Sequence, residues 1–293
     1  MGTITYHPNI DLVLDGRTLE IIRIAHGPIS TPIPFHAHGR GCYELHYHIS
    51  GHGTVFIDDD RHDMGPGALY ITGPDVRHAQ LPDPDDPIHE YCINLALHDA
   101  PGDATTNGYL PGVLASMKRF VCTDHESLSQ LFPRLFEEYR QRRAGYRQCA
   151  EALLKEIIIA ALRNNTKLPK PPQPYNAEAI ANEATPVTDM QRSMLVDQYF
   201  LRDYGKQSLS GLAEELALGP RQTQRLLQRY YGKSFSEKTL ESRMGFARLL
   251  LTETDASITD IAQHAGYAST AHFGAAFRTC YGAAPSEYRR NHR

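Results

Sequence analysis

The chain has 293 residues, of which 41% are hydrophobic and 22% charged, and its net charge is -4. This length allows two ordinary domains, and these proportions exclude a largely disordered protein. No apolar run approaches the ~20 residues of a membrane-spanning helix, and residues 1–10 lack the basic start and apolar stretch of a signal peptide. We therefore expect a cytoplasmic protein with no membrane partner.

The first 100 residues consist of short segments in which polar and apolar residues alternate, separated by Gly, Pro and Asp. Alternation of this kind is typical of β-strands with one buried face. It predicts strands at residues 44–49, 54–57 and 91–95. We expect a small all-β unit in this region.

Two longer segments follow, at residues 128–139 and 146–162, and both have a helical pattern. In the second, the stripe expected on one face consists of Cys149, Ala152, Leu153, Glu156, Ile157 and Ala160. This helix either packs on its own β-domain or pairs antiparallel with the same helix of a second subunit, which would make the protein a homodimer.

A proline-dense stretch, with four prolines in residues 169–174, interrupts the helical pattern. Proline cannot continue a helix, so this stretch is predicted to be a semi-extended linker. The predicted domains are therefore residues 1–163, which contain the β-unit and the helices that could mediate dimerisation, 164–188 for the linker, and 189–293 for a helical domain.

Charge differs between the two halves of the chain. Residues 187–293 contain 14 Lys and Arg against 11 Asp and Glu, whereas residues 1–186 contain 16 against 23. The basic excess thus falls in the helical domain. A DNA-binding role depends more on where these cations cluster than on their sum.

The helical domain contains an internal repeat. Apolar residues with spacing i, i+3, i+4 and i+7 occur twice, 49 residues apart: Leu209, Leu212, Ala213 and Leu216, then Ile258, Ile261, Ala262 and Ala265. Each short helix is preceded by a serine suited to N-capping, and is followed by a tight turn and a second helix, at 221–230 and 269–281. Two helices joined in this way form a helix-turn-helix, and residues 236–252 would be the rigid spacer between the two units.

This region is similar to the DNA-binding domain of the arabinose-regulator (AraC/XylS) family over about residues 194–290. The matching residues include Ser208-Leu209-x-x-Leu212-Ala213, Gly232-Lys233-Ser234-Phe235, Ser257-Ile258-x-x-Ile261-Ala262-x-x-x-Gly266-Tyr267 and Phe277-Arg278-x-x-Tyr281-Gly282-x-x-Pro285. The resemblance implies that the second helix of each unit enters the major groove of double-stranded DNA.

The first such helix carries side chains that can read bases, namely Arg221, Gln222, Gln224, Arg225, Gln228 and Arg229. The resemblance assigns Arg221, Gln224 and Arg225 to base edges, and Gln228 or Arg229 to phosphates. The second helix offers Ser269, Thr270 and His272, and has Ala275 where many relatives carry an arginine. We therefore expect the second unit mainly to contact phosphates and to respond to DNA shape.

The N-terminal region resembles the two motifs of cupin barrels. The matching residues are Pro34-Phe35-His36-Ala37-His38, Glu44, Gly51, Gly65-Pro66-Gly67 and Pro74-Asp75-Val76-Arg77-His78. Sugar-responsive regulators of the same family, such as the rhamnose regulators, look similar here. The resemblance implies a small β-barrel in which His36, His38, Glu44 and His78 hold a divalent metal, and three imidazoles with one carboxylate suit Zn, Ni, Fe or Mn.

A metal-free pocket is the alternative, in which the same side chains hydrogen-bond a sugar-like effector. Strand geometry places Glu44, His46 and His48 on one face, with Leu45, Tyr47 and Ile49 on the other. The further candidates for effector binding are Arg40, Tyr43, His46, His48 and Asn94.

The sequence therefore predicts an α+β multidomain protein: an N-terminal cupin-like β-barrel with flanking helices, and a C-terminal all-α domain with two helix-turn-helix units. Its expected function is transcription regulation, with no enzymatic activity. We expect activation through RNA polymerase, in response to a small, carbohydrate-type effector. The alternative is a cupin metalloenzyme, an isomerase or dioxygenase with an accessory helical domain, but this leaves the helical repeat without a purpose.

Overall fold

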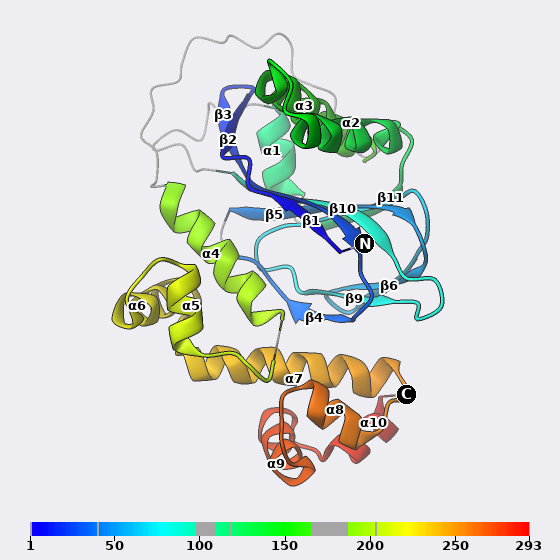
Figure 1. Ribbon diagram of the computed structural model, residues 1–293. Coiled ribbons are helices and arrows are strands. Elements are labelled where there is room, and N and C mark those ends of the chain that lie inside the picture. Colours follow the sequence, from blue (N-terminus) through cyan, green and yellow to red (C-terminus); the bar gives the residue numbers. More distant parts are fainter. Residues whose placement is uncertain are drawn as a thin grey trace. The chain divides into compact units, whose positions relative to one another are not determined.

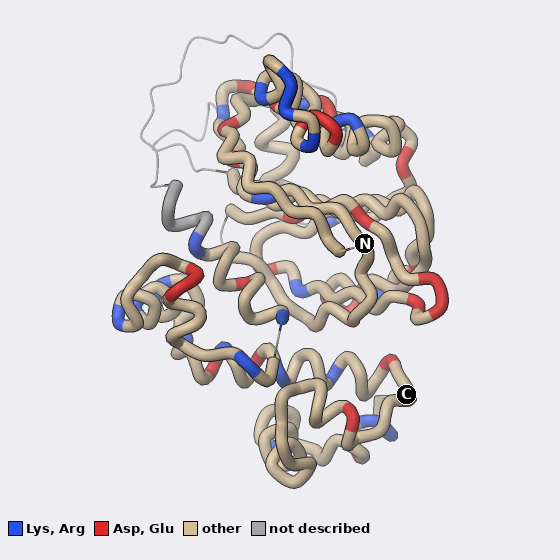
Figure 2. Tube along the Cα trace, in the orientation of Figure 1, with Lys and Arg blue, Asp and Glu red and all other residues tan. Residues whose placement is uncertain are grey.

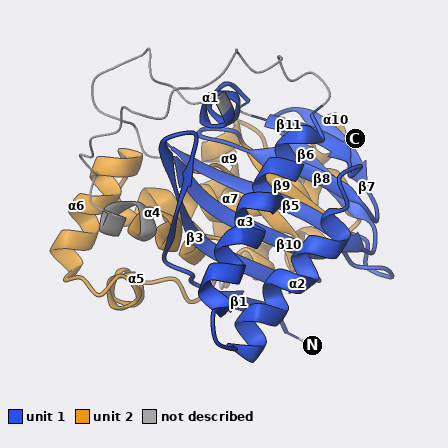
Figure 3. Cartoon of the chain, turned by 90° about the horizontal axis from the view of Figure 1, so that it is seen from above, with its two compact units in different colours: residues 1–31, 40–76, 82–190 blue, residues 32–39, 77–81, 191–293 orange. Residues whose placement is uncertain are grey.

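The computed structural model describes residues 2–39, 41–97, 109–117, 119–165, 187–202 and 204–292. It divides into two compact units (Figure 3). The first comprises Met1–Thr31, Arg40–Val76 and Pro82–Met190, and the second comprises Pro32–Gly39, Arg77–Leu81 and Gln191–Arg293. Most of the predicted linker, residues 166–186, lies outside the described residues, so the predicted domain boundaries stay predictions.

The first unit is built on a large antiparallel sheet with the strand order β1-β3-β10-β5-β8-β11, in which β2 pairs with β3. Its strands are β1 Ile4–Tyr6, β2 Ile10–Leu14, β3 Arg17–Pro28, β5 Cys42–Ser50, β8 Ala68–Thr72, β10 His89–Leu97 and β11 Arg119–Thr123. A hairpin of β6 (Gly53–Ile57) and β7 (Asp60–Met64) belongs to the same unit. The three predicted strands are confirmed as parts of β5, β6 and β10.

The two faces of the sheet differ in polarity because side chains alternate along each strand. On the paired strands β5 and β10, Leu45 lies opposite Ile93, and both belong to the main apolar core. Glu44 lies opposite Asn94, and both are buried away from that core cluster. The predicted separation of apolar and polar side chains is thus confirmed.

Helices α2 (Leu128–Gln141) and α3 (Tyr146–Arg163) cover the apolar face of this sheet, and α1 (Tyr109–Ser116) lies beside them (Figure 1). The predicted stripe of α3 is partly wrong, because Cys149 and Ala152 are exposed while Leu154 and Ile158 are buried. The helix contains two adjacent apolar rows, and packing against α2, with smaller contacts to α1 and β2, buries the row that also includes Leu154 and Ile158. Helix α3 therefore packs on its own domain.

The second unit joins a strand pair to the C-terminal helices. Strand β4 (Ile33–His36) is antiparallel to β9 (His78–Pro82), with His36 opposite His78. The helices are α4 Val187–Phe200, α5 Leu209–Glu215, α6 Pro220–Tyr231, α7 Phe235–Glu253, α8 Ile258–His264, α9 Thr270–Tyr281 and α10 Pro285–Asn291.

Helix α7 is the predicted spacer, and it lies between two apolar clusters. Near its start, Phe235 packs against the cluster of α4, α5 and α6. Farther along, Met244 and Leu251 are buried in the cluster of α8, α9 and α10. Its 19 residues span about 28 Å, with α5–α6 near its start and α8–α9 farther along it (Figure 1). The expected fold class is confirmed: an N-terminal β-rich domain and a C-terminal domain with two helix-turn-helix units.

The turns of the two units match bond for bond. In the first, the backbone N–H of Leu218 donates to the carbonyl of Ala213 at 2.9 Å; in the second, Tyr267 donates to Ala262 at 2.9 Å. Both turns need a residue with positive φ, which is Gly266 at 78° in the second and Ala217 at 50° in the first. The first unit thus places an alanine where a left-handed backbone favours glycine.

Candidate DNA-binding helices and histidine site

Helix α6 presents a polar, basic face opposite its buried face. Thr223, Leu226 and Leu227 are buried in the first helix-turn-helix unit. The predicted reading residues lie on the other side: Arg221, Gln222, Arg225, Gln228 and Arg229 are exposed, and Gln224 is half-buried. Basic residues are visible along the trace of α6 in Figure 2. This face can donate hydrogen bonds to base edges and phosphates.

The turn before α6 fixes how the helix begins. Gly219 precedes Pro220, whose missing N–H costs nothing at the first helical position. The Gln222 side chain accepts a hydrogen bond from the Gly219 N–H at 3.1 Å. Gln222 is therefore already used to cap the helix, which leaves Arg221, Gln224 and Arg225 as the stronger candidates for base contacts.

Helix α9 offers a surface with little charge. Ser269 caps the helix by accepting from the N–H of His272, and Thr270 and His272 are exposed in its first turn. Ala275 is exposed in the next turn, and Phe273 and Phe277 face the core. The short side chains on this face can approach phosphates closely but carry few groups that distinguish bases.

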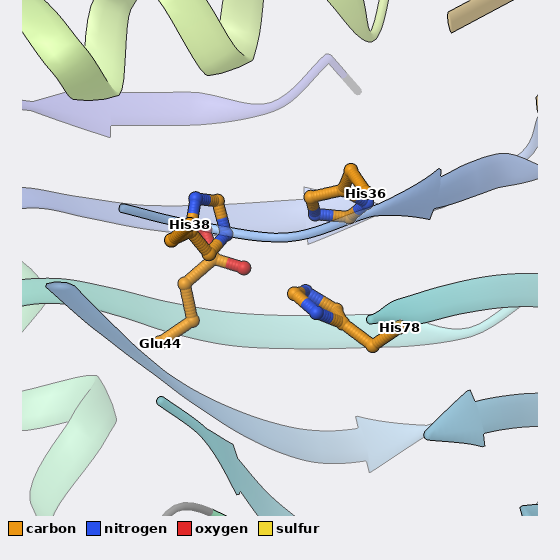
Figure 4. Close-up of side chains that lie close together, drawn as sticks. All are labelled: His36, His38, Glu44 and His78. Carbon is orange, nitrogen blue, oxygen red and sulfur yellow. The ribbon is translucent and has the colours of Figure 1, made fainter. Parts of the chain in front are cut away.

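The three histidines predicted as metal ligands come together: His36 on β4, His38 two residues after β4, and His78 on β9 (Figure 4). The ring centroids of His36 and His78 are 4.0 Å apart, and those of His38 and His78 are 5.4 Å apart. Each of His36, His38 and His78 offers one ligand atom, and these atoms lie within 4.8 Å of one another. The structure thus brings together three of the four residues named by the cupin resemblance. Glu44 belongs to the other compact unit, so its part in this site stays a prediction.

Hydrogen bonds define which ring nitrogens of two histidines carry protons. Nδ1 of His36 lies 2.8 Å from the carbonyl oxygen of Pro34, and Nδ1 of His38 lies 3.0 Å from a carboxylate oxygen of Asp197. Both partners are acceptors, so Nδ1 is the donor in each ring. Nε2 is then the atom with a lone pair, as a metal ligand requires.

The Glu44 carboxylate accepts hydrogen bonds at both oxygens. Asn94 donates from Nδ2 to Oε1, and Nε2 of His46 lies 3.2 Å from Oε2. Arg23 in turn donates to Oδ1 of Asn94 at 3.1 Å. These contacts fix the orientation of Glu44, as expected of a carboxylate that binds a cation or a polar ligand.

His46 continues this network to a second buried carboxylate. Its Nδ1 lies 3.1 Å from an oxygen of Glu90, and Nε2 of His48 lies 3.6 Å from the same oxygen. Burial alone would lower the pKa of His46, but its surroundings, Glu90 among them, raise the pKa well above its usual value. Burial alone would likewise raise the pKa of Glu90, but His46 and His48 lower the pKa far below its usual value. We describe His46 and Glu90 as a buried ion pair.

Several predicted pocket residues take different positions. His46, His48 and Asn94 join the polar network, whereas Tyr43 lies in the apolar core on the opposite face of β5, and Arg40 lies outside the described residues. Sequence reasoning missed Glu90, Cys92 and Asp197. Cys92 lies close enough to Glu44 and His46 to offer a ligand atom with them, but its thiol pKa is raised by burial.

Two domain families match this chain. Residues 21–158 match the AraC-like ligand binding domain, and residues 212–291 match a helix-turn-helix domain. Together with the fold, these matches define the class: proteins that join an AraC-like ligand-binding domain to a DNA-binding domain. Over these residues the chain is similar to AraC-family proteins.

Curated relatives match parts of the chain. The HTH-type transcriptional regulator ArgR of Pseudomonas aeruginosa is 33% identical over 82 residues, which are 28% of this chain and 25% of ArgR. The regulatory protein PocR of Salmonella typhimurium is 30% identical over 139 residues, which are 47% of this chain and 43% of PocR. The matched regions span less than half the length of these relatives.

Solved structures are matched over most of their own length. The AraC-type regulator from Chromobacterium violaceum is 30% identical and covers 33% of this chain and 88% of its own, with a TM-score of 0.32. ToxT from Vibrio cholerae, solved with an unsaturated fatty acid, is 15% identical and covers 91% of this chain and 93% of its own, with a TM-score of 0.33. Among the described residues, no helix is long and apolar enough to cross a membrane.

Proposed function

We propose that this protein is a sequence-specific transcription regulator in which α6 and α9 dock into successive major grooves of one DNA duplex. The observation that carries this proposal is the exposed face of α6, where Arg221, Gln224 and Arg225 stand opposite the buried Leu226 and Leu227. Helix α7 supports this arrangement, because it contacts both helix-turn-helix units and is a rigid spacer between them.

The two reading helices have unequal roles in this proposal. Arg221, Gln224 and Arg225 on α6 read bases, and Gln228 or Arg229 contacts phosphate. Ser269, Thr270 and His272 on α9 contact phosphates and respond to DNA shape. The exposed Ala275 supports this division, because an alanine side chain has no donor or acceptor for a base.

The N-terminal domain is proposed to bind a small polar effector of the carbohydrate class. The buried polar network around Glu44, His46 and Asn94 supports this, because a polyhydroxylated ligand needs fixed donors and acceptors. Effector binding would regulate the protein through different affinities for two arrangements of the chain. Homodimerisation, activation through RNA polymerase and a cytoplasmic location complete the proposal.

A divalent transition metal, Zn, Ni, Fe or Mn, is proposed as the cofactor. His36, His38 and His78 would supply imidazole ligands, with Glu44 as the carboxylate. The donor set fits a metal because hydrogen bonds leave the lone pair of two of these rings on Nε2. A bound ion would attract oxygen atoms of an effector as a Lewis acid.

DNA binding is tested by measuring the affinity of the full chain for a random duplex at increasing salt concentration. A regulator that releases counterions from several phosphates loses affinity steeply, with a linear dependence of log K on log salt concentration. The double substitution Arg221→Ala with Arg225→Ala should weaken binding, whereas Lys155→Ala, on α3, should leave it unchanged. Equal affinity of the double variant and the wild type would contradict the proposal.

A further inference from the structure

The buried carboxylate of Asp197, on α4, contacts a predicted metal ligand with one oxygen and the end of the first reading helix with the other. Its Oδ2 lies 3.0 Å from Nδ1 of His38, and its Oδ1 accepts a hydrogen bond from the hydroxyl of Tyr231 at 2.7 Å. Both His38 and Asp197 have side chains that are 2% exposed. Tyr231 is the last residue of α6.

Tyr231 is also held on α4 by Ser193, one helical turn before Asp197. Its hydroxyl lies 3.2 Å from the hydroxyl of Ser193 and 2.9 Å from the backbone carbonyl oxygen of Ser193, which is a second acceptor for the Tyr231 proton beside the closer Asp197. Ser193 can donate to Tyr231 while Tyr231 donates to Asp197, so both hydroxyl groups are satisfied. The C-terminal end of α6 is therefore tied to the same turn of α4 that holds His38.

Strand β4 also packs directly on α7 within this unit. A Cβ atom on Gly245 would lie 3.3 Å from the carbonyl oxygen of Phe35, so the glycine lets the strand approach closely. The guanidinium of Arg248 lies 4.3 Å from the centre of the Phe35 ring. Strand β4, which carries His36 and leads into His38, is thus fixed against α7, which follows the reading helix.

We infer that Asp197 is a positioning residue that couples metal binding at His38 to the position of α6. This inference rests on the proposed metal site. A carboxylate on the second ring nitrogen orients a metal-bound histidine and strengthens its bond to the metal. Because the same carboxylate holds Tyr231, a change in the His38 ring on metal binding alters the anchor of the reading helix. Metal and DNA then change each other's affinity by the same factor.

The test uses the full chain with Zn²⁺ and Ni²⁺ as probes and compares the wild type with Asp197→Asn and Tyr231→Phe. Asparagine has almost the same shape, but its single oxygen can accept from only one of the two donors. His36→Ala provides the baseline for metal bound by other histidines. Tyr230→Phe, at the preceding position of α6, is the matched control for Tyr231→Phe. Metal affinity is measured without DNA, and DNA affinity is measured with and without metal.

We expect saturating metal to change the DNA affinity of the wild type by at least about fivefold. Asp197→Asn should lower metal affinity by about 10- to 100-fold. Tyr231→Phe should keep a metal affinity close to that of the wild type, but its DNA affinity should no longer respond to metal. Tyr230→Phe should behave as the wild type.

Four results would overturn the inference. If Asp197→Asn binds metal as tightly as the wild type, and its DNA affinity responds to metal as that of the wild type does, the proposed coupling through Asp197 is wrong, although the proposed metal site is retained. The coupling is also wrong if the DNA affinity of the wild type is the same with and without metal. It is wrong as well if Tyr230→Phe reduces the effect of metal on DNA affinity as strongly as Tyr231→Phe does. If the wild type binds no more metal than His36→Ala, the proposed metal site fails, and the coupling fails with it.

Discussion

Replacing Glu90 by glutamine removes the negative charge from a buried ion pair and leaves the shape of the side chain almost unchanged. Glu90 accepts from Nδ1 of His46 at 3.1 Å, and the two side chains are 11% and 6% exposed. Removing one partner of a buried pair costs about 3–5 kcal/mol when the other charge is left without compensation. Nε2 of His46 keeps its contact with Glu44 at 3.2 Å, so the lower end of this range, about 3 kcal/mol, applies here. We therefore expect Glu90→Gln to lower the free energy of unfolding of the N-terminal domain by this amount.

The same domain contains a matched control. His52 and Asp86 form a closer pair, at 2.6 Å, but both side chains are 60% exposed. Water screens such a pair, so Asp86→Asn should change the free energy of unfolding by at most about 1 kcal/mol. The comparison separates the effect of burial from that of a charge change alone.

The direction of each pKa shift sets the pH of the experiment. The pKa of Glu90 is lowered, so its stabilising contribution is present above the usual value of 4.5 and is lost as the pH falls through the folded pKa. The pKa of His46 is raised, so its contribution is present below the usual value of 6.5 and is lost as the pH rises through the folded pKa. Both contributions are present between 4.5 and 6.5.

Urea denaturation at a pH in this window, followed by circular dichroism, is the assay, because the chain contains no tryptophan for fluorescence. The reasoning would be refuted if Glu90→Gln lowered the free energy of unfolding by no more than Asp86→Asn does. It would mean that the buried pair contributes no more to the free energy of unfolding than the exposed pair does.

Three further predictions follow from single positions. Ala217→Gly should raise the free energy of unfolding by about 1 kcal/mol in chemical denaturation, because φ at this position is 50°; an unchanged or lower stability would contradict this account of the turn. Arg225→Ala should reduce discrimination at one base pair by about 1–3 kcal/mol, measured as the ratio of affinities for matched and mismatched duplexes, and the double change Thr270→Ala with His272→Ala should reduce it less. His78→Ala should remove most of the bound metal in elemental analysis of protein purified without chelators, and retention of one full equivalent would exclude this histidine as a ligand.

Patterns that depend on near neighbours predicted much of the fold. The alternation at residues 44–49 predicted that Leu45 and Tyr47 face the core and that Glu44 and His46 do not. The repeat predicted both helix-turn-helix units, because each unit is a short local structure with its own capping serine. Ser208 and Ser257 cap α5 and α8 as expected.

Contacts between distant residues could not be predicted in this way. Glu90 meets His46 only because β10 pairs with β5 in one particular register, with Glu90 opposite His48. Asp197 lies 159 positions from His38 along the chain, and no local pattern connects them. The buried face of α3 was predicted only in part, because two apolar rows run side by side on this helix and tertiary packing decides which of them is buried. In each case, tertiary packing supplies the missing information.

Selection of binding sites from a random pool of duplex DNA by the full chain tests the central claim most directly. The account predicts one enriched sequence with two parts about one helical turn apart, in which the part read by α6 is more strongly specified. Selection with Arg221→Ala plus Arg225→Ala should lose the specification of that part. Recovery of unselected DNA by the wild type, or an unchanged sequence from the double variant, would contradict the assignment of α6 as the reading helix.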